Sequence, residues 1–320
     1  MRTRHAVAAG LLALTAGCSS DVPRAPEPGP KAQAERDPAA KAAPQPPEAR
    51  RPGPLAPALA GEPAVPTSPR EAAAQIEAAD RVVAETAPIP ALLAAAGHTQ
   101  SLALRELADR PGWDARVADL LPRDLRRDTA DNVAARREFR SMHPSDPADL
   151  ATELPAWRIV APRPAAELRG FYREAERRYG VTWEYLAAIN LVETGFGRIK
   201  GTSVAGAQGP MQFIPTTWDI YGEGGDVHDP RDAILAAGRL LQANGFASDR
   251  AGALHRYNNS TAYVRGVTLY AEVMQRRPGA YLGYHQWPIY YLTRAGSIWL
   301  PEGYDEAEPL PVRVWLTRTD

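Results

Sequence analysis

A single carboxylate, Glu193, stands near the end of an apolar helical run and directly before Thr-Gly. Leu186, Ile189 and Glu193 fall at positions i, i+3 and i+7, so they share one face of the predicted helix. The two aliphatic residues make this the buried face, and burial raises the pKa of a carboxyl group. A glutamic acid that stays protonated near neutral pH can act as a general acid. The alternative is a glutamate that reaches solvent in the last helical turn.

A second stretch, AGAQGPMQFIPTTW, occupies residues 205–218. Gly206 and Gly209 allow the backbone to approach a ligand closely. Gln212 offers a donor and an acceptor between two apolar neighbours, where an unpaired amide would be costly. The stretch therefore predicts a ligand-binding loop, and the alternative is a turn in which Gln212 bonds the local backbone.

A third stretch, HRYNNSTAYV, lies at the predicted end of one helix and the start of the next. Tyr257 and Asn258 end the first helix, and Tyr263 begins the second. An aromatic face beside amides suits a sugar that carries an N-acetyl group. The alternative for Asn258 is an ordinary helix C-cap.

The three stretches together resemble the lytic transglycosylases of bacterial cell walls, over roughly residues 160–277. The shared elements are Glu-Thr followed by glycine, then Gly-Ala-x-Gly-x-Met-Gln-x-x-Pro-x-x-Trp, then Ala-Leu-x-x-Tyr-Asn and Tyr-Val. The Glu-Thr and Gly-Pro-Met-Gln-Phe forms are nearest to the group similar to membrane-bound lytic transglycosylase B. The resemblance implies a mainly α, lysozyme-like (goose-type or SLT) fold and peptidoglycan glycan strands as substrate.

In this family one glutamate does the acid–base work, and Glu193 matches it. The resemblance implies that the glutamate protonates the glycosidic oxygen between N-acetylmuramic acid and N-acetylglucosamine. It then acts as a base while a 1,6-anhydro ring closes, with assistance from the substrate's own acetamido group. The resemblance also assigns residues that line or support the sugar cleft: Gln212, Met211, Tyr257, Asn258 and Tyr263. This sequence departs from the family pattern at Arg256, at Asn259-Ser260 and at Pro210.

Two other functions stay open on the sequence. Asp226 lies in a glycine-rich loop and could activate a water, which would make the protein a hydrolytic muramidase. Asp229 and Asp232 are instead explained as helix-start residues. A non-catalytic, wall-binding lipoprotein with the same fold is the second alternative, although a pure binder has no need of a buried acid.

The N-terminus predicts export. Residues 1–18 contain Arg2 and Arg4 before an apolar segment that is shorter than the ~20 residues a bilayer span needs. Thr-Ala-Gly-Cys resembles a lipobox, which would make Cys18 a lipidation site; the alternative is an ordinary residue near a cleavage site. Residues 19–68 are rich in proline and alanine, and we expect a disordered tether between a membrane that faces the cell wall and a folded domain.

The rest of the chain divides by pattern into three parts. Residues 69–155 predict a helical subdomain that supports rather than catalyses, beginning with a capping box at Ser68-Pro-Arg-Glu. Residues 156–277 predict the catalytic domain, with at least five helices. Residues 278–320 predict an aromatic, β-rich C-terminal extension, in which VRVWLTR reads as a third strand.

Composition argues against several classes of partner. The formal net charge of −1 over 320 residues gives no general attraction to nucleic acid. One cysteine excludes an internal disulfide and a CxxC metal site. His228 and His255 are isolated in the sequence, so we expect no metal and no cofactor. The sequence leaves protein partners undetermined.

Overall fold

The computed structural model describes most of the chain from residue 59 onward: residues 59, 62–85, 88–203 and 205–319. The predicted signal at 1–18, the lipidation site Cys18 and most of the predicted tether at 19–68 lie outside the described residues. None of the helices in the described part combines the length and the apolar character needed to cross a membrane.

Helices dominate the N-terminal part, as predicted. They are α1 (Pro69–Val83), α2 (Pro90–Asp109), α3 (Asp114–Leu120) and α4 (Arg123–Ser141), with short 3-10 turns at Pro111–Trp113 and Pro147–Asp149. The Ser68 hydroxyl accepts a hydrogen bond from the Glu71 amide at 3.2 Å, and the Glu71 carboxylate accepts one from the Thr67 amide at 2.8 Å. The predicted cap at the start of α1 is therefore present.

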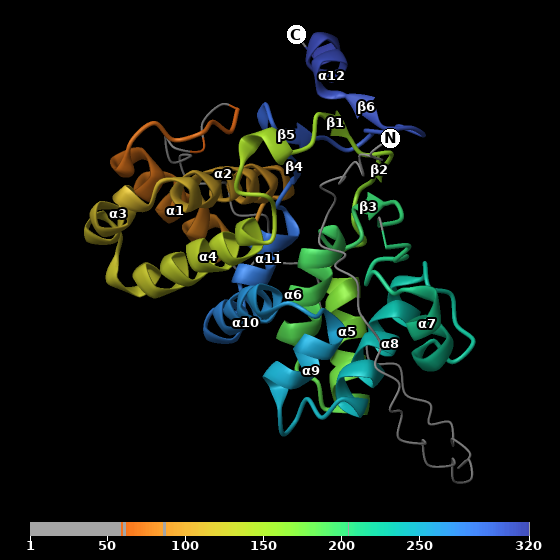
Figure 1. The fold of residues 1–320 in the computed structure, drawn as a ribbon. Helices are drawn as coiled ribbons and strands as arrows, with labels where there is room; N and C mark the ends of the chain where they lie inside the picture. The colour runs from red at the N-terminus through yellow and green to blue at the C-terminus, as the bar shows by residue number, and fades with distance from the viewer. Residues whose placement is uncertain (1–58, 60–61, 86–87, 204, 320) are drawn as a thin grey trace, which may run out of the picture.

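Six helices form the predicted lysozyme-like region: α5 (Ala165–Tyr179), α6 (Trp183–Thr194), α7 (Pro215–Tyr221), α8 (Pro230–Ala243), α9 (Arg250–Tyr257) and α10 (Thr261–Arg276). The mainly α fold expected from the sequence is confirmed. Helix α10 packs on α6 with one side and on α4 with another, as Figure 1 shows. Helix α10 thus joins the N-terminal helices to the helix that carries Glu193.

The C-terminal extension is less β-rich than predicted. Its first segment is a helix, α11 (Ala280–His285), and the hairpin of β4 (Ile289–Thr293) and β5 (Gly296–Leu300) follows. Short pairs join β1 (Glu153–Leu154) to β6 (Leu310–Pro311) and β2 (Arg158–Ile159) to β3 (Ile199–Lys200).

The prediction of a third strand at VRVWLTR was wrong. Residues Val312–Thr319 form helix α12. The partner of β6, β1, is only two residues long, and pairing with this segment ends where the Val312 amide donates to the Thr152 carbonyl at 3.0 Å. Over so few residues, the pattern of apolar and polar residues fits both the period of a strand and that of a helix. A helix forms its backbone hydrogen bonds internally and needs no partner strand.

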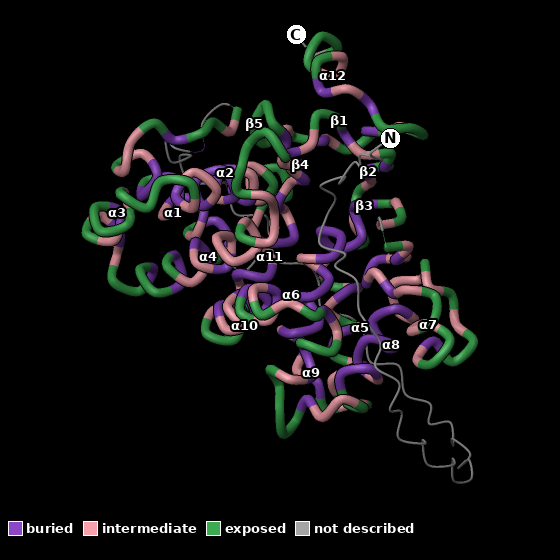
Figure 2. The backbone as a smooth tube through the Cα atoms, viewed as in Figure 1, coloured by how far each residue is buried: buried purple, intermediate pink, exposed green. Residues whose placement is uncertain are grey.

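One buried cluster runs through the N-terminal helices and the lysozyme-like helices together. It includes Leu104 and Leu107 of α2 and Leu186 and Ile189 of α6. Figure 2 shows α6 buried over most of its length. The helix that carries Glu193 is therefore surrounded by other elements, and the face that bears Leu186 and Ile189 has no exposed surface.

Candidate active site

Glu193 lies inside the protein, one residue before the end of α6. Its residue exposure is 3%. The Tyr263 hydroxyl, at the start of α10, donates a hydrogen bond to Glu193 Oε1 at 2.7 Å. The structure thus has the buried arrangement rather than the alternative in which the side chain reaches solvent.

Burial raises the pKa of Glu193 from an ordinary value of 4.5 to about 8, because the ionised form loses its hydration. The Tyr263 hydrogen bond acts in the opposite direction, since it stabilises the carboxylate. No other described group shifts this pKa, so Glu193 has neither a cationic partner nor a second carboxylate beside it. Glu193 is consequently protonated at neutral pH.

The chain turns sharply directly after Glu193. Gly195, Phe196 and Gly197 all adopt left-handed backbone conformations, with φ of 59°, 65° and 80°. The positive φ at position 195 favours glycine, and a Cβ there would also lie 2.5 Å from Ile289 Cδ1, so the end of that side chain would have to shift. The Thr194 hydroxyl accepts a hydrogen bond from the Gly197 amide at 2.9 Å. The turn therefore fixes where α6 ends and holds Glu193 in the last turn.

Helix α6 also holds the loop of residues 205–214. The Pro210 carbonyl accepts hydrogen bonds from Asn190 Nδ2 at 2.8 Å and from the Thr194 hydroxyl at 2.7 Å. Asn190 is oriented in turn by the Tyr172 hydroxyl, which donates to its Oδ1 at 2.6 Å. These buried bonds fix the loop relative to the helix of Glu193.

Gln212 lies in this loop and bonds the local backbone. Its φ is 51°, and its Nε2 donates to the Gly209 carbonyl at 3.0 Å. Gly209 has a φ of 73°, and a Cβ there would lie 1.9 Å from the Val227 carbonyl oxygen. This hydrogen bond matches the alternative considered from the sequence, in which Gln212 bonds the backbone of a local turn. The next residue back, Met211, has no exposed surface and supports the loop from within the core.

Two tyrosines connect this loop to Glu193. The rings of Tyr257 and Tyr263 are stacked, with centroids 6.4 Å apart and an interplanar angle of 7°. The Tyr257 hydroxyl donates to the Met211 carbonyl at 2.7 Å. Glu193, Tyr263, Tyr257 and Met211 thus form one connected group, and Gln212 follows Met211 in the chain.

Asn258 is buried beside this group, with 5% exposure, and its Oδ1 has no hydrogen-bond partner among the described residues. A buried amide oxygen without a partner is costly, and a ligand can supply the donor. The Asn259-Ser260 departure is accommodated: the Ser260 hydroxyl accepts from the Tyr263 amide at 3.3 Å and caps α10. This cap fixes the start of the helix that presents Tyr263.

Asp226 does not join the group around Glu193. It is exposed, and its Oδ1 accepts a hydrogen bond from the His228 amide at 2.8 Å within the local turn. Asp229 caps α8, as predicted, by accepting from the amides of Arg231 and Asp232 at 2.9 and 3.0 Å. The described residues contain no cluster of three or more His, Cys, Asp or Glu side chains that could hold a metal ion.

Sequence reasoning missed three residues that hold the site. Asn190 and Thr194 are polar residues four apart on an apolar helix, and this spacing on one face was a signal that could have identified them. Phe139 of α4 packs edge-on against the Tyr263 ring, with centroids 6.4 Å apart. A single phenylalanine in a distant helix gives no such signal in the sequence.

Comparison with known proteins gives one match. Residues 171–273, about a third of the chain, match the family model described as the transglycosylase SLT domain. The matched range contains Glu193, the 205–214 loop and both tyrosines. No curated protein and no solved structure matched the chain. The match supports the resemblance of this region to the lytic transglycosylases and to their lysozyme-like fold.

Proposed function

We propose that the protein is a lytic transglycosylase that cleaves the glycan strands of peptidoglycan without water. The observation that carries this proposal is a buried Glu193 that is protonated at neutral pH and has no second carboxylate beside it among the described groups. Most glycoside hydrolases use two carboxylates, whereas a single acid suits a reaction in which the substrate supplies its own nucleophile.

Glu193 acts first as an acid. Tyr263 donates to Oε1, which leaves Oε2 as the oxygen that carries the proton. This proton goes to the glycosidic oxygen between N-acetylmuramic acid and N-acetylglucosamine. As the bond from C1 to that oxygen breaks, the electron pair goes to the leaving oxygen. The acetamido oxygen of the muramic acid then closes on C1 to give an oxazolinium ion.

Glu193 acts next as a base. Its carboxylate takes the proton of the muramic acid 6-hydroxyl, and O6 attacks C1 and displaces the acetamido oxygen. The products are a new N-acetylglucosamine end and a 1,6-anhydro-muramic acid end. The glutamate returns to its protonated form, so atoms and protons balance without a water.

The remaining predicted residues hold the sugars. Tyr257 supplies an aromatic face next to Tyr263, and the unpaired Asn258 Oδ1 can accept a hydrogen bond from an N-acetyl amide. Gln212 and Met211 shape the loop from Gly209 onward, with Gln212 as the more exposed of the two.

The proposal extends to the location of the enzyme. We infer an exported protein anchored by a lipid on Cys18 to a membrane that faces the wall, with residues 19–68 as the tether. Within the family, the Glu-Thr and Gly-Pro-Met-Gln-Phe sequences favour the group similar to membrane-bound lytic transglycosylase B. Labelling with a palmitate analogue would test the anchor, and Cys18→Ala should abolish the label.

The activity is tested by digesting purified peptidoglycan and weighing the soluble products by mass spectrometry. We expect muropeptides with anhydro ends, lighter by one water than hydrolysed products, and none with Glu193→Gln. Reducing muramic acid ends would instead show a muramidase, and loss of those products in Asp226→Asn would implicate Asp226. Sedimentation with the wall and no release of product would show a binding protein.

A further inference from the structure

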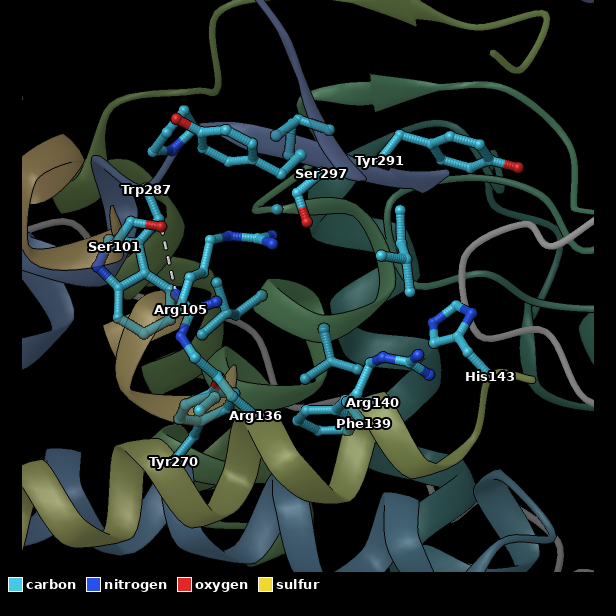
Figure 3. Close-up of a pocket in the computed structure, with 18 of the residues that line it drawn as sticks. Ser101, Arg105, Arg136, Phe139, Arg140, His143, Tyr270, Trp287, Tyr291 and Ser297 are labelled. Atoms are coloured by element: carbon cyan, nitrogen blue, oxygen red, sulfur yellow. Dashed lines mark hydrogen bonds between the residues drawn. The ribbon is translucent and has the colours of Figure 1, made fainter. Parts of the chain in front are cut away.

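A cavity of about 250 Å³ lies against α6, on the side of Leu191 and Val192. Its other walls come from α2, α4, α10 and the β4–β5 hairpin, as Figure 3 shows. Two lining residues, Asp109 and Ser297, are exposed and mark its opening. Most of this cavity is built by residues outside the 171–273 range, from the N-terminal helices and from the segment around the β4–β5 hairpin.

Three arginines line the cavity, and none of them forms a salt bridge with a described residue. Arg136 donates to the Ser101 hydroxyl at 3.2 Å and stacks on the Trp287 ring at 4.3 Å. Arg105 stacks on the Tyr290 ring at 4.5 Å. The buried Nε atoms of both have no hydrogen-bond partner among the described residues.

The third arginine, Arg140, completes the cationic lining. Its Nη1 donates only to the Pro144 carbonyl among the described groups, at 2.9 Å. Figure 3 shows Arg140 and His143 together at one end of the cavity, with Arg105 and Arg136 at the other. Unpaired guanidinium groups along one cavity favour an anionic ligand, and their planar geometry suits a carboxylate.

The titratable groups that line the cavity do not neutralise the positive charge of the three arginines. Burial and the neighbouring Arg136 lower the pKa of Arg105 to about 9, so the group is still cationic at neutral pH. Burial and Arg140 lower the pKa of His143, which is therefore neutral there. Asp109 is the one acidic residue among the described lining residues, and its carboxylate is exposed at the opening.

The cavity lies next to the catalytic group. Leu191 and Val192 line it and directly precede Glu193. Phe139 lines it with one side and packs its ring against Tyr263, whose hydroxyl bonds Glu193. Phe139 and Tyr263 therefore connect the cavity to Glu193.

We propose that this cavity binds the carboxylates of the short acidic peptide that peptidoglycan carries on its muramic acid. This inference rests on the proposed function, because the muramic acid is the sugar whose C1 bond Glu193 would cleave. The peptide is attached to the lactyl ether of that same sugar, so it must leave the cleft close to Glu193. Alanine methyl groups suit the apolar wall of Leu191, Val192 and Leu292, and glutamate carboxylates suit the arginines.

Direct binding tests the cavity without any cleavage. The probes are N-acetylmuramyl-L-alanyl-γ-D-glutamate and the same compound with its carboxylates converted to amides. We expect the full-length wild type to bind the acid at least about tenfold more tightly than the amide, since a hydrogen bond to a charged group is replaced by a neutral one. Equal affinities for the two probes would overturn the proposal.

Variants locate the binding. Arg140→Gln should weaken binding of the acid about tenfold, and Arg140→Lys should restore part of it. Arg105→Gln should act in the same direction. If it lowers the melting temperature, Arg140 alone decides the test, since its side chain makes a single described hydrogen bond. The exposed Arg116, on α3, is the matched control, and Arg116→Gln should change nothing. An equal loss in Arg116→Gln would contradict the proposal.

Two further outcomes separate this inference from the proposed function. Cleavage of intact peptidoglycan without any preference for the acid probe would refute the cavity and leave the transglycosylase. A clear preference for the acid probe without cleavage would refute the transglycosylase and leave the peptide site. Vesicles of phosphatidylglycerol are the test of another anion: binding to them that Arg140→Gln removes, without binding of the peptide probe, would show a lipid headgroup site.

Discussion

Two groups of arginines lie at opposite ends of α4, and they differ in whether acids accompany them. At one end, Arg276 and Arg277 of the α10 terminus both bond the Asp128 carboxylate, at 2.9 and 3.1 Å. Arg277 also lies 3.5 Å from Asp80 and 3.2 Å from Asp124. At the other end, the cavity arginines form no salt bridge with described residues.

The difference separates charges that hold the fold together from charges that are left for a ligand. The acids around Arg276 and Arg277 come from α1 and α4, so this network ties three helices together. Glu193 belongs with the other class, because it is buried without a cation. Burying an ionisable group without a partner costs free energy. Such groups are concentrated at functional sites. Two sets of unpaired ionisable groups lie at the end of α6: Glu193 on the helix itself, and the arginines of the cavity beside it.

The largest expected effect is on catalysis. Glu193→Gln keeps the shape and the hydrogen bond from Tyr263 but cannot give up a proton. We expect the rate of peptidoglycan solubilisation to fall about 10³-fold or more. The melting temperature should not fall, because the amide removes an ionisable group from a buried position. Residual activity within tenfold of wild type would show that another group is the acid.

The next effect tests the paired arginines. Asp128→Ala removes the acceptor that Arg276 and Arg277 share, while Asp131, Asp80 and Asp124 remain beside them. We expect a loss of about 2 kcal/mol in the free energy of unfolding, measured with urea. The matched control is Asp114→Ala, which removes the exposed partner of Arg137 and should cost less than about 1 kcal/mol. Equal losses in the two variants would show that burial does not distinguish the pairs.

A smaller effect concerns the tyrosine beside the acid. Tyr263→Phe removes the hydrogen bond that lowers the pKa of Glu193, so the pKa should rise further. Activity that needs the protonated acid is present below this pKa and lost above it, so the alkaline limb of the pH–rate profile should move to higher pH. We also expect kcat to fall about tenfold, since the carboxyl loses its orienting contact. A limb that moves to lower pH would contradict this.

The sequence predicted the local features of the site better than the long-range ones. Ser68 and Asp229 reveal helix starts because a cap involves residues only two or three apart. The buried face of Glu193 was predictable from helical periodicity alone. The side-chain bond of Gln212 was not, because it depends on the left-handed backbone at Gly209 and Gln212.

The arginine cavity shows where sequence reasoning fails. Arg105 and Arg136 lie on different helices and meet only when α2 packs on α4. Each looks like an ordinary charged residue on an amphipathic helix, and charged residues there are normally solvated. The absence of an acid beside them is a property of the folded chain. The prediction of a strand at the position of α12 failed for a related reason, because a strand depends on a partner that the local sequence pattern does not show.

The most direct test of the account is the titration of Glu193 itself. Protein labelled with ¹³C at the glutamate carboxyl carbons can be titrated by NMR, with Glu193→Gln to identify the resonance. We expect the wild-type carboxyl to titrate with a pKa of about 8, far above the ordinary 4.5, because burial removes the hydration of the ionised form. A pKa near 4.5 would mean that Glu193 is ionised at neutral pH, and it would contradict the assignment of Glu193 as the general acid.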